Sequence, residues 1–146
     1  MKKRPTRCVR PARAFSLIEM LIVLVLAAIL ASLALPAYDG YLRRAHRTEA
    51  RTALLQAAHR LEREATATGS YANAQLPETL GSVPGGRYRV LRLAPPDAFA
   101  AATRFMLHAV PQGAQAADAC GTFTLNNTGE RGLLDNKASV ADCWNR

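Results

Sequence analysis

The sequence predicts an α+β protein with a long N-terminal helix, the first half of which crosses a membrane. Three observations lead to this fold class. Residues 14–35 form one apolar run, residues 42–67 repeat apolar side chains at helical spacing, and three short strand-like segments follow. We expect the helix to pack on a short antiparallel sheet. The order of the strands in that sheet stays open.

The apolar run at residues 14–35 is long enough to cross a bilayer, which needs about 20 apolar residues. It contains one carboxylate, Glu19, and an ionisable group within a membrane segment is costly and marks a functional site. Six basic residues and no acidic one precede it in residues 1–13, which predicts a cytoplasmic position for this end. A secretory signal peptide is the alternative, but its apolar core would be about 7–15 residues long.

The helix is expected to continue beyond the apolar run, through residues 42–67. Its predicted apolar stripe consists of alanines and leucines, namely Ala50, Leu54, Ala57, Leu61 and Ala65, flanked by Ala53 and Ala58. From Phe15 to Ala67 such a helix would be about 80 Å long at 1.5 Å per residue. A domain of this size cannot bury that length, so lipid or other copies of the chain must cover the first half.

Strand-like segments occupy residues 87–93, 103–110 and 121–126, where apolar and polar side chains partly alternate. Prolines and glycines supply the connections between them. The tail from residue 128 onward is expected to be mostly irregular, with Cys143 tying it back to the third strand.

Two of the three cysteines are expected to form a disulfide. Cys8 lies in the basic segment, whereas Cys120 and Cys143 are a pair in a domain expected outside the cytoplasm. Neither belongs to a CxxC or Cys–His spacing, so no metal site is predicted. The histidines are widely spaced and have no nucleophile beside them, so we expect no enzyme and no cofactor.

The formal net charge of +8 does not by itself indicate a nucleic-acid partner, because six of the nineteen basic residues precede residue 14. Without them, thirteen basic side chains face eleven acidic ones. Two basic groups remain: Arg43, Arg44, Arg47 and Arg51 with His46 on the helix, and Arg87, Arg89, Arg92 and Arg104 near the strands. The first group would contact anionic lipid or DNA, or form a solvated or subunit-paired helix face. The second could contact single strands, but outward arginines are ordinary on a sheet, so the sequence allows DNA as a partner without favouring it.

Residues 15–19 read Phe-Ser-Leu-Ile-Glu directly after the basic segment, and this junction resembles the leader and N-terminal motif of type IV pilins. The resemblance implies that a prepilin peptidase cuts between Ala14 and Phe15 and that Phe15 is then N-methylated. It implies that Glu19 meets the amine of Phe15 in a neighbouring subunit, and that the helix has a kink at Pro36. The family usually has Gly before the cut, so Ala14 departs from the pattern.

The second half of the chain resembles the PilE-type minor pilins, and ComP-like DNA-uptake pilins share this outline. The matching segments are Pro111-Gln112-Gly113, the run from Cys120 to Asn126, Thr128-Gly129 and the pair Cys143-Trp144. The resemblance implies three parts: a cleaved leader at 1–14, a transmembrane and assembly half-helix at 15–42, and an extracytoplasmic domain at 43–146.

The expected function is that of a structural and assembly subunit, a minor pilin, of a bacterial type IV pilus. The protein would wait in the inner membrane and then enter an extracellular filament, with other pilins, the prepilin peptidase and the assembly machinery as partners. A DNA-uptake receptor pilin and a type II secretion pseudopilin are the alternatives, and the cysteine pair with its terminal Cys-Trp disfavours the second. Adhesion, twitching motility and DNA uptake all occur in the family, and the sequence does not choose among them.

Overall fold

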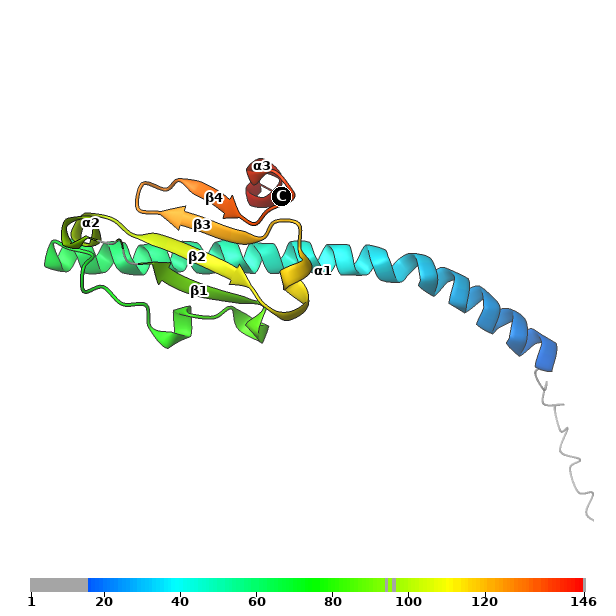
Figure 1. The fold of residues 1–146 in the computed structure, drawn as a ribbon. Coiled ribbons are helices and arrows are strands. Elements are labelled where there is room, and N and C mark those ends of the chain that lie inside the picture. The colour runs from blue at the N-terminus through cyan, green and yellow to red at the C-terminus, as the bar shows by residue number, and fades with distance from the viewer. Residues whose placement is uncertain (1–15, 94, 96, 146) are drawn as a thin grey trace, which may run out of the picture. The chain divides into compact units, whose positions relative to one another are not determined.

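The computed structural model describes residues 16–93, 95 and 97–145. The chain divides into two compact units, one that ends at Tyr38 and one that begins at Asp39. The first unit is helical from Leu17 onward, and the second unit contains all of the strands (Figure 1).

Helix α1 (Leu17–Thr68) begins in the first unit and ends in the second. Its end is set by Gly69, whose positive φ of 76° suits glycine and whose N–H donates to the carbonyl of Ala65 at 2.7 Å. The predicted end of the helix at residue 67 is therefore correct to within one residue. Helix is assigned on both sides of position 36, and the kink expected at Pro36 stays a prediction.

The second unit carries a four-stranded antiparallel sheet in the order β1-β2-β3-β4 (Figure 1). Its strands are β1 (Tyr88–Leu93), β2 (Met106–Pro111), β3 (Thr122–Asn126) and β4 (Arg131–Leu134). Consecutive strands are neighbours throughout, so the sheet is a simple meander. One row of the register joins Leu91, His108, Thr124 and Gly132 across all four strands.

Two helices and a strand correct the sequence prediction. Helix α2 (Ala98–Thr103) begins at Asp97, whose carboxylate accepts from the Ala100 N–H at 2.7 Å, so the second strand starts at Met106 instead of residue 103. The tail that was expected to be mostly irregular contains β4 and α3 (Val140–Asn145), and that prediction was wrong.

The strand β4 is held by local contacts that its short sequence does not reveal. The Asn126 side chain accepts from the N–H groups of Thr128 and Glu130 and so shapes the turn before β4. At Gly132, an added Cβ would lie 2.6 Å from Oγ1 of Thr124, so the glycine leaves room for the Thr124 side chain on the neighbouring strand.

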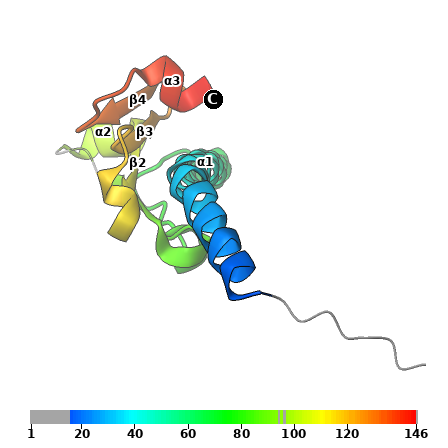
Figure 2. The ribbon, with the colours of Figure 1, turned by 90° about the vertical axis from the view of Figure 1, so that its right-hand side faces the viewer.

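The core of the second unit lies between the later half of α1 and the inner face of the sheet, as the view along the helix shows (Figure 2). Four members of the predicted stripe, Ala50, Leu54, Ala57 and Leu61, have no solvent exposure, and they join buried sheet residues such as Leu107. Ala65, in the last turn of α1, is only half-buried. Short 3₁₀ turns, η1 (Glu78–Leu80), η2 (Pro84–Gly86) and η3 (Gly113–Ala117), lie in the connections.

Candidate functional site

The first half of α1 exposes an apolar surface on all sides. Every described residue from Ser16 to Leu35 is exposed, with Leu17 and Leu33 exposed to 78% and 71% of their surface. Among the described residues, α1 is the one helix that is long and apolar enough to cross a membrane. A surface of this kind is stable in water only when lipid or protein covers it.

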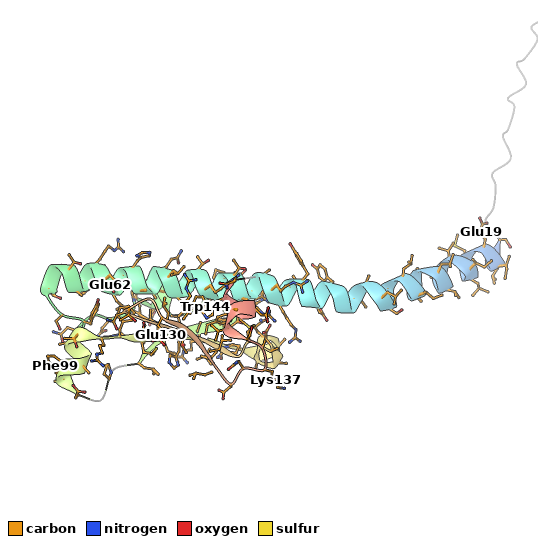
Figure 3. All side chains as sticks on the ribbon, turned by 90° about the horizontal axis from the view of Figure 1, so that it is seen from above. Glu19, Glu62, Phe99, Glu130, Lys137 and Trp144 are labelled. Carbon is orange, nitrogen blue, oxygen red and sulfur yellow. A yellow bond between two sulfur atoms is a disulfide. The ribbon has the colours of Figure 1, made fainter. Side chains whose placement is uncertain are left out.

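Glu19 is the one charged side chain among residues 16–38, and it lies in the first turn of α1 (Figure 3). A carboxylate is favoured there because the helix dipole places partial positive charge at the N-terminus. Ala14 and Phe15, to which cleavage and methylation were assigned, lie outside the described residues. The assembly role of Glu19 therefore stays a prediction.

The predicted basic group on α1 does not form one surface, because two of its arginines are bound within the domain. Nη2 of Arg47 lies 3.0 Å from Oδ1 of Asp118, and Nε donates to both carboxylate oxygens. Nη1 of Arg51 donates to the carbonyl of Trp144 at 2.6 Å. Burial, followed by the nearby charges of Arg47 and Arg131, lowers the pKa of Arg51.

Asp118 is the centre of a buried polar network. Its carboxylate has no exposed surface and accepts from the Cys120 N–H at 2.7 Å and from Nε2 of Gln115 at 3.0 Å. The same Gln115 nitrogen donates to the hydroxyl of Tyr88. Burial raises the pKa of Tyr88 to about 12, although the hydrogen bond from Gln115 acts in the opposite direction. The network joins α1, β1 and the segment before the disulfide.

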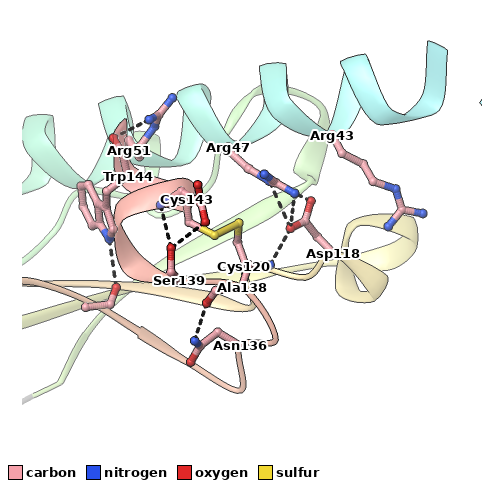
Figure 4. Close-up of a disulfide and its surroundings, with 12 residues drawn as sticks. Arg43, Arg47, Arg51, Asp118, Cys120, Asn136, Ala138, Ser139, Cys143 and Trp144 are labelled. Carbon is pink, nitrogen blue, oxygen red and sulfur yellow. Dashed lines mark hydrogen bonds and ion pairs between the residues drawn. A yellow bond between two sulfur atoms is a disulfide. The ribbon is translucent and has the colours of Figure 1, made fainter. Parts of the chain in front are cut away.

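The disulfide between Cys120 and Cys143 is present, as the sequence predicted (Figure 4). It closes a loop that contains β3, β4 and the first residues of α3. Trp144, the residue after Cys143, packs against this loop: its ring lies edge-on to Phe123 at 5.5 Å, and its Nε1 donates to the carbonyl of Gly132 at 3.0 Å. The C-terminal loop is therefore a packed element, tied covalently and by hydrogen bonds to the sheet.

The four arginines near the strands are not brought together into one patch. Arg92 donates to the carbonyls of Ala74 and Tyr71 and so holds the loop after α1, and burial lowers its pKa. Arg87, Arg89 and Arg104 are exposed. Arg87 precedes the β1 end that pairs with Pro111, and Arg104 precedes the β2 residue Met106, which pairs with the other end of β1. These two arginines therefore lie near opposite ends of the strand.

Sequence reasoning missed Asp118, Gln115 and the two tethers from α1. Arg47 and Asp118 are 71 positions apart, and Arg51 and Trp144 are 93 apart. An Asp two residues before a cysteine is the one local signal in the sequence, because a carboxylate at that spacing can accept from the cysteine N–H, as Asp118 does from Cys120. Within the described residues, no group of three or more His, Cys, Asp or Glu side chains is placed to hold a metal ion.

Comparison with known proteins gives consistent matches over both parts of the chain. Residues 36–124 match the family described as type IV minor pilin ComP, DNA uptake sequence receptor, and residues 9–35 match the prokaryotic N-terminal methylation motif. Among curated proteins, no match was found.

Two solved structures are similar to this chain. A type IV pilin from Shewanella oneidensis is 30% identical over 66% of this chain and 98% of its own, with a TM-score of 0.49. The non-core minor pilin PilV from Neisseria meningitidis is 23% identical over 68% of this chain and 94% of its own, with a TM-score of 0.54. The second likeness is one of fold.

Proposed function

We propose that this chain, which belongs to the family of the type IV minor pilin ComP, enters the pilus through its N-terminal helix after the leader is removed. As a type IV minor pilin it is a pilus subunit, and its family and fold are those of structural pilins. The observation that carries the proposal is the fully exposed apolar half of α1. Such a surface needs lipid before assembly and neighbouring subunits after it.

The proposed sequence of events follows from topology and charge. The six basic residues of the leader keep the N-terminus in the cytoplasm while residues 17–35 lie in the inner membrane. A prepilin peptidase then cuts between Ala14 and Phe15, which creates a free amine that becomes methylated. Glu19 of a neighbouring subunit pairs with that amine, because two opposite charges in a medium of low dielectric each lack water and need a partner. The protein carries out no chemistry of its own.

The cleavage step is tested by the mass of the chain recovered from sheared filaments. The expected mass is that of residues 15–146 with one N-terminal methyl group and one disulfide. A chain that begins near Ala34 or Pro36 would indicate an ordinary signal peptide and contradict the proposal. Replacement of Phe15 by Ser leaves the leader charge unchanged and serves to show whether the residue after the cut matters.

The description of the matched family as DNA uptake sequence receptor favours a second proposed function, the binding of DNA by the extracytoplasmic unit. Arg89 and Arg104 are exposed and form no ion pair among the described residues, so they are free to meet phosphates. The small charge excess of the chain without its leader argues against strong non-specific attraction. A receptor would therefore depend on local contacts and on base recognition.

An anisotropy titration of several duplex sequences across salt concentrations distinguishes the two functions. A filament subunit without a receptor role should bind at the non-specific level of roughly 10⁻⁴–10⁻⁶ M, with no sequence preference and with loss at higher salt. Submicromolar binding with a preference for one short sequence would support the receptor. Arg89→Gln/Arg104→Gln should then weaken binding, whereas Arg63→Gln, an exposed arginine on α1, is the matched control.

A further inference from the structure

A recess in the second unit gathers cationic side chains from separate segments of the chain. It has a volume of about 330 Å³ and is lined by Arg43 and His46 of α1, by Arg87 before β1, and by residues of η2 and η3. Figure 4 shows the Arg43 side chain reaching from α1 toward the segment that carries Asp118, with no interaction drawn to its guanidinium. Asp39 is the one carboxylate in the lining.

The two arginines of this recess are unpaired, which distinguishes them from Arg47. Among the described residues, neither Arg43 nor Arg87 has a carboxylate within ion-pair distance, whereas the Arg47 side chain is matched by Asp118. The recess therefore holds at least one more positive charge than negative charge, before His46 is considered. An anion entering it would meet guanidinium groups that have no acid to displace.

Two of the side chains that line the recess, Arg87 and His46, contact the surrounding chain. The Arg87 guanidinium lies over Gly85, where an added Cβ would be 2.3 Å from its Nη1, and Nη1 is 3.5 Å from the carbonyl oxygen of Pro84. Nδ1 of His46 lies 3.1 Å from Oε1 of Gln115, a residue that is itself buried and bound to Asp118. These contacts restrain the side chains of Arg87 and His46 before any ligand arrives, which lowers the cost of binding.

We propose that this recess binds the phosphate of an anionic phospholipid headgroup while the protein waits in the membrane. The position of the recess along the chain favours a lipid headgroup as the source of the phosphate. Arg43 follows Leu35, the end of the apolar run, by eight residues. Even a fully extended chain spans at most about 3.6 Å per residue, so the Arg43 backbone lies within roughly 29 Å of that end. A phosphate group is the natural ligand of converging guanidinium groups at a membrane surface.

The inference rests on the proposed insertion of residues 17–35 into the membrane. A headgroup bound in the recess would be given up when the subunit leaves the bilayer, so binding would favour the waiting state over the filament. Duplex DNA is another phosphate-bearing partner that this chain could meet, but a duplex is a stiff rod that lies across a surface. A recess near the end of the apolar run is better placed for a headgroup.

The test uses the full chain in nanodiscs of phosphatidylcholine that contain a trace of photoactivatable phosphatidylglycerol or, in a second arm, photoactivatable phosphatidylcholine. After illumination and proteolysis, mass spectrometry should find the phosphatidylglycerol adducts on peptides that line the recess. Arg43→Gln/Arg87→Gln should reduce these adducts roughly tenfold or more, since each basic side chain near an anionic surface contributes to binding. Phosphatidylcholine adducts should not change.

The matched control is Arg44→Gln/Arg89→Gln. It removes the same charge from the same two parts of the chain, and neither residue lines the recess. An equal loss of adducts in the two double variants would mean diffuse attraction and overturn the proposal. A chain that enters nanodiscs but shows no preference for phosphatidylglycerol also overturns it and leaves the filament function intact. Failure of the chain to enter nanodiscs at all would contradict both the headgroup proposal and the proposed filament function.

Two further arms separate the sources of phosphate. Inorganic phosphate added to chains in pure phosphatidylcholine nanodiscs should give no binding that depends on Arg43 and Arg87. Binding of free phosphate as strong as that of the lipid would overturn the choice of a headgroup. Duplex DNA that displaces the phosphatidylglycerol adducts, with the same dependence on the two arginines, would assign the recess to nucleic acid instead.

Discussion

Arg47 of α1 and Asp118 form an ion pair across 71 positions of sequence, with 3.0 Å between Nη2 and Oδ1 and no exposed surface on the Asp118 side chain. A second ion pair of the described residues, Arg60 with Glu64, lies on one helix face and is partly exposed, with 43% and 31% of the two side chains accessible. The two pairs have similar lengths and should have very different energetic weight, because only the first holds distant segments together in a buried place.

Asp118→Asn should therefore destabilise the unit formed by residues 39–146 by about 3–5 kcal/mol, since it leaves the Arg47 charge half-buried without its partner. Glu64→Gln should cost only about 0.3–0.5 kcal/mol. Urea unfolding of both variants and the parent gives the comparison. Equal effects of the two substitutions would show that the buried pair does not tie α1 to the C-terminal loop.

Glu19→Ala should permit membrane insertion and impair assembly. Removal of a carboxylate from a membrane segment favours insertion by up to about 3 kcal/mol at the bilayer centre and by less near its edge. The chain should therefore remain in the membrane fraction while its amount in sheared filaments falls. Glu62→Ala, which removes a carboxylate from the later part of α1, controls for a general loss of charge. Wild-type amounts of Glu19→Ala in filaments would refute the pairing with Phe15.

Loss of the disulfide should destabilise the same unit by about 2–5 kcal/mol, because the unfolded chain gains the freedom of a loop that spans 23 positions. Cys120→Ser/Cys143→Ser is the test, with thermal unfolding as the measurement. Cys8→Ser is the control, since that cysteine lies in the segment expected to be cut away. Two alkylatable thiols in freshly isolated wild-type protein would contradict the bridge itself.

His108 should make the domain sensitive to mild acid. It lies half-buried on β2, and burial lowers the pKa of its imidazole below the ordinary value of 6.5. Because the pKa is lower in the folded state, the unfolded state binds the proton first as the pH falls. The stability that the neutral His108 contributes is therefore complete above about pH 6.5 and is lost as pH falls through the folded pKa. His108→Gln should shrink the drop in urea midpoint between about pH 7.5 and 5. His59→Gln removes an exposed imidazole and is the matched control.

The large features of the fold could be predicted because each has a local cause. The apolar run and the alanine-leucine stripe both follow from side-chain periodicity, and the stripe is buried at Ala50, Leu54, Ala57 and Leu61. The disulfide follows from the count of cysteines left after the leader is set aside. Membership of the pilin family was recognisable at residues 15–19 for the same reason, since that motif is contiguous.

The missed features depend on tertiary contacts. The strand β4 has four residues and includes Gly132, so its own sequence carries almost no strand signal, and pairing with β3 supplies its conformation. The hydrogen-bond partners of Arg92 could not be predicted for a similar reason. Its guanidinium donates to carbonyls 18 and 21 positions earlier, and no pattern within β1 indicates that Arg92 is partly buried while Arg89 is exposed.

The contacts that Arg47 and Arg51 of α1 make lie on the two sides of the loop closed by the disulfide. Arg47 holds Asp118, two residues before Cys120, and Arg51 holds Trp144, one residue after Cys143 (Figure 4). Arg47 and Arg51 are four residues apart on the helix, which is about one turn. A force on α1 therefore acts on both ends of the loop at the same time, because the disulfide joins the segments that carry Asp118 and Trp144. Such a joint cannot be peeled open from one end, and under tension along the filament both tethers would have to shear together.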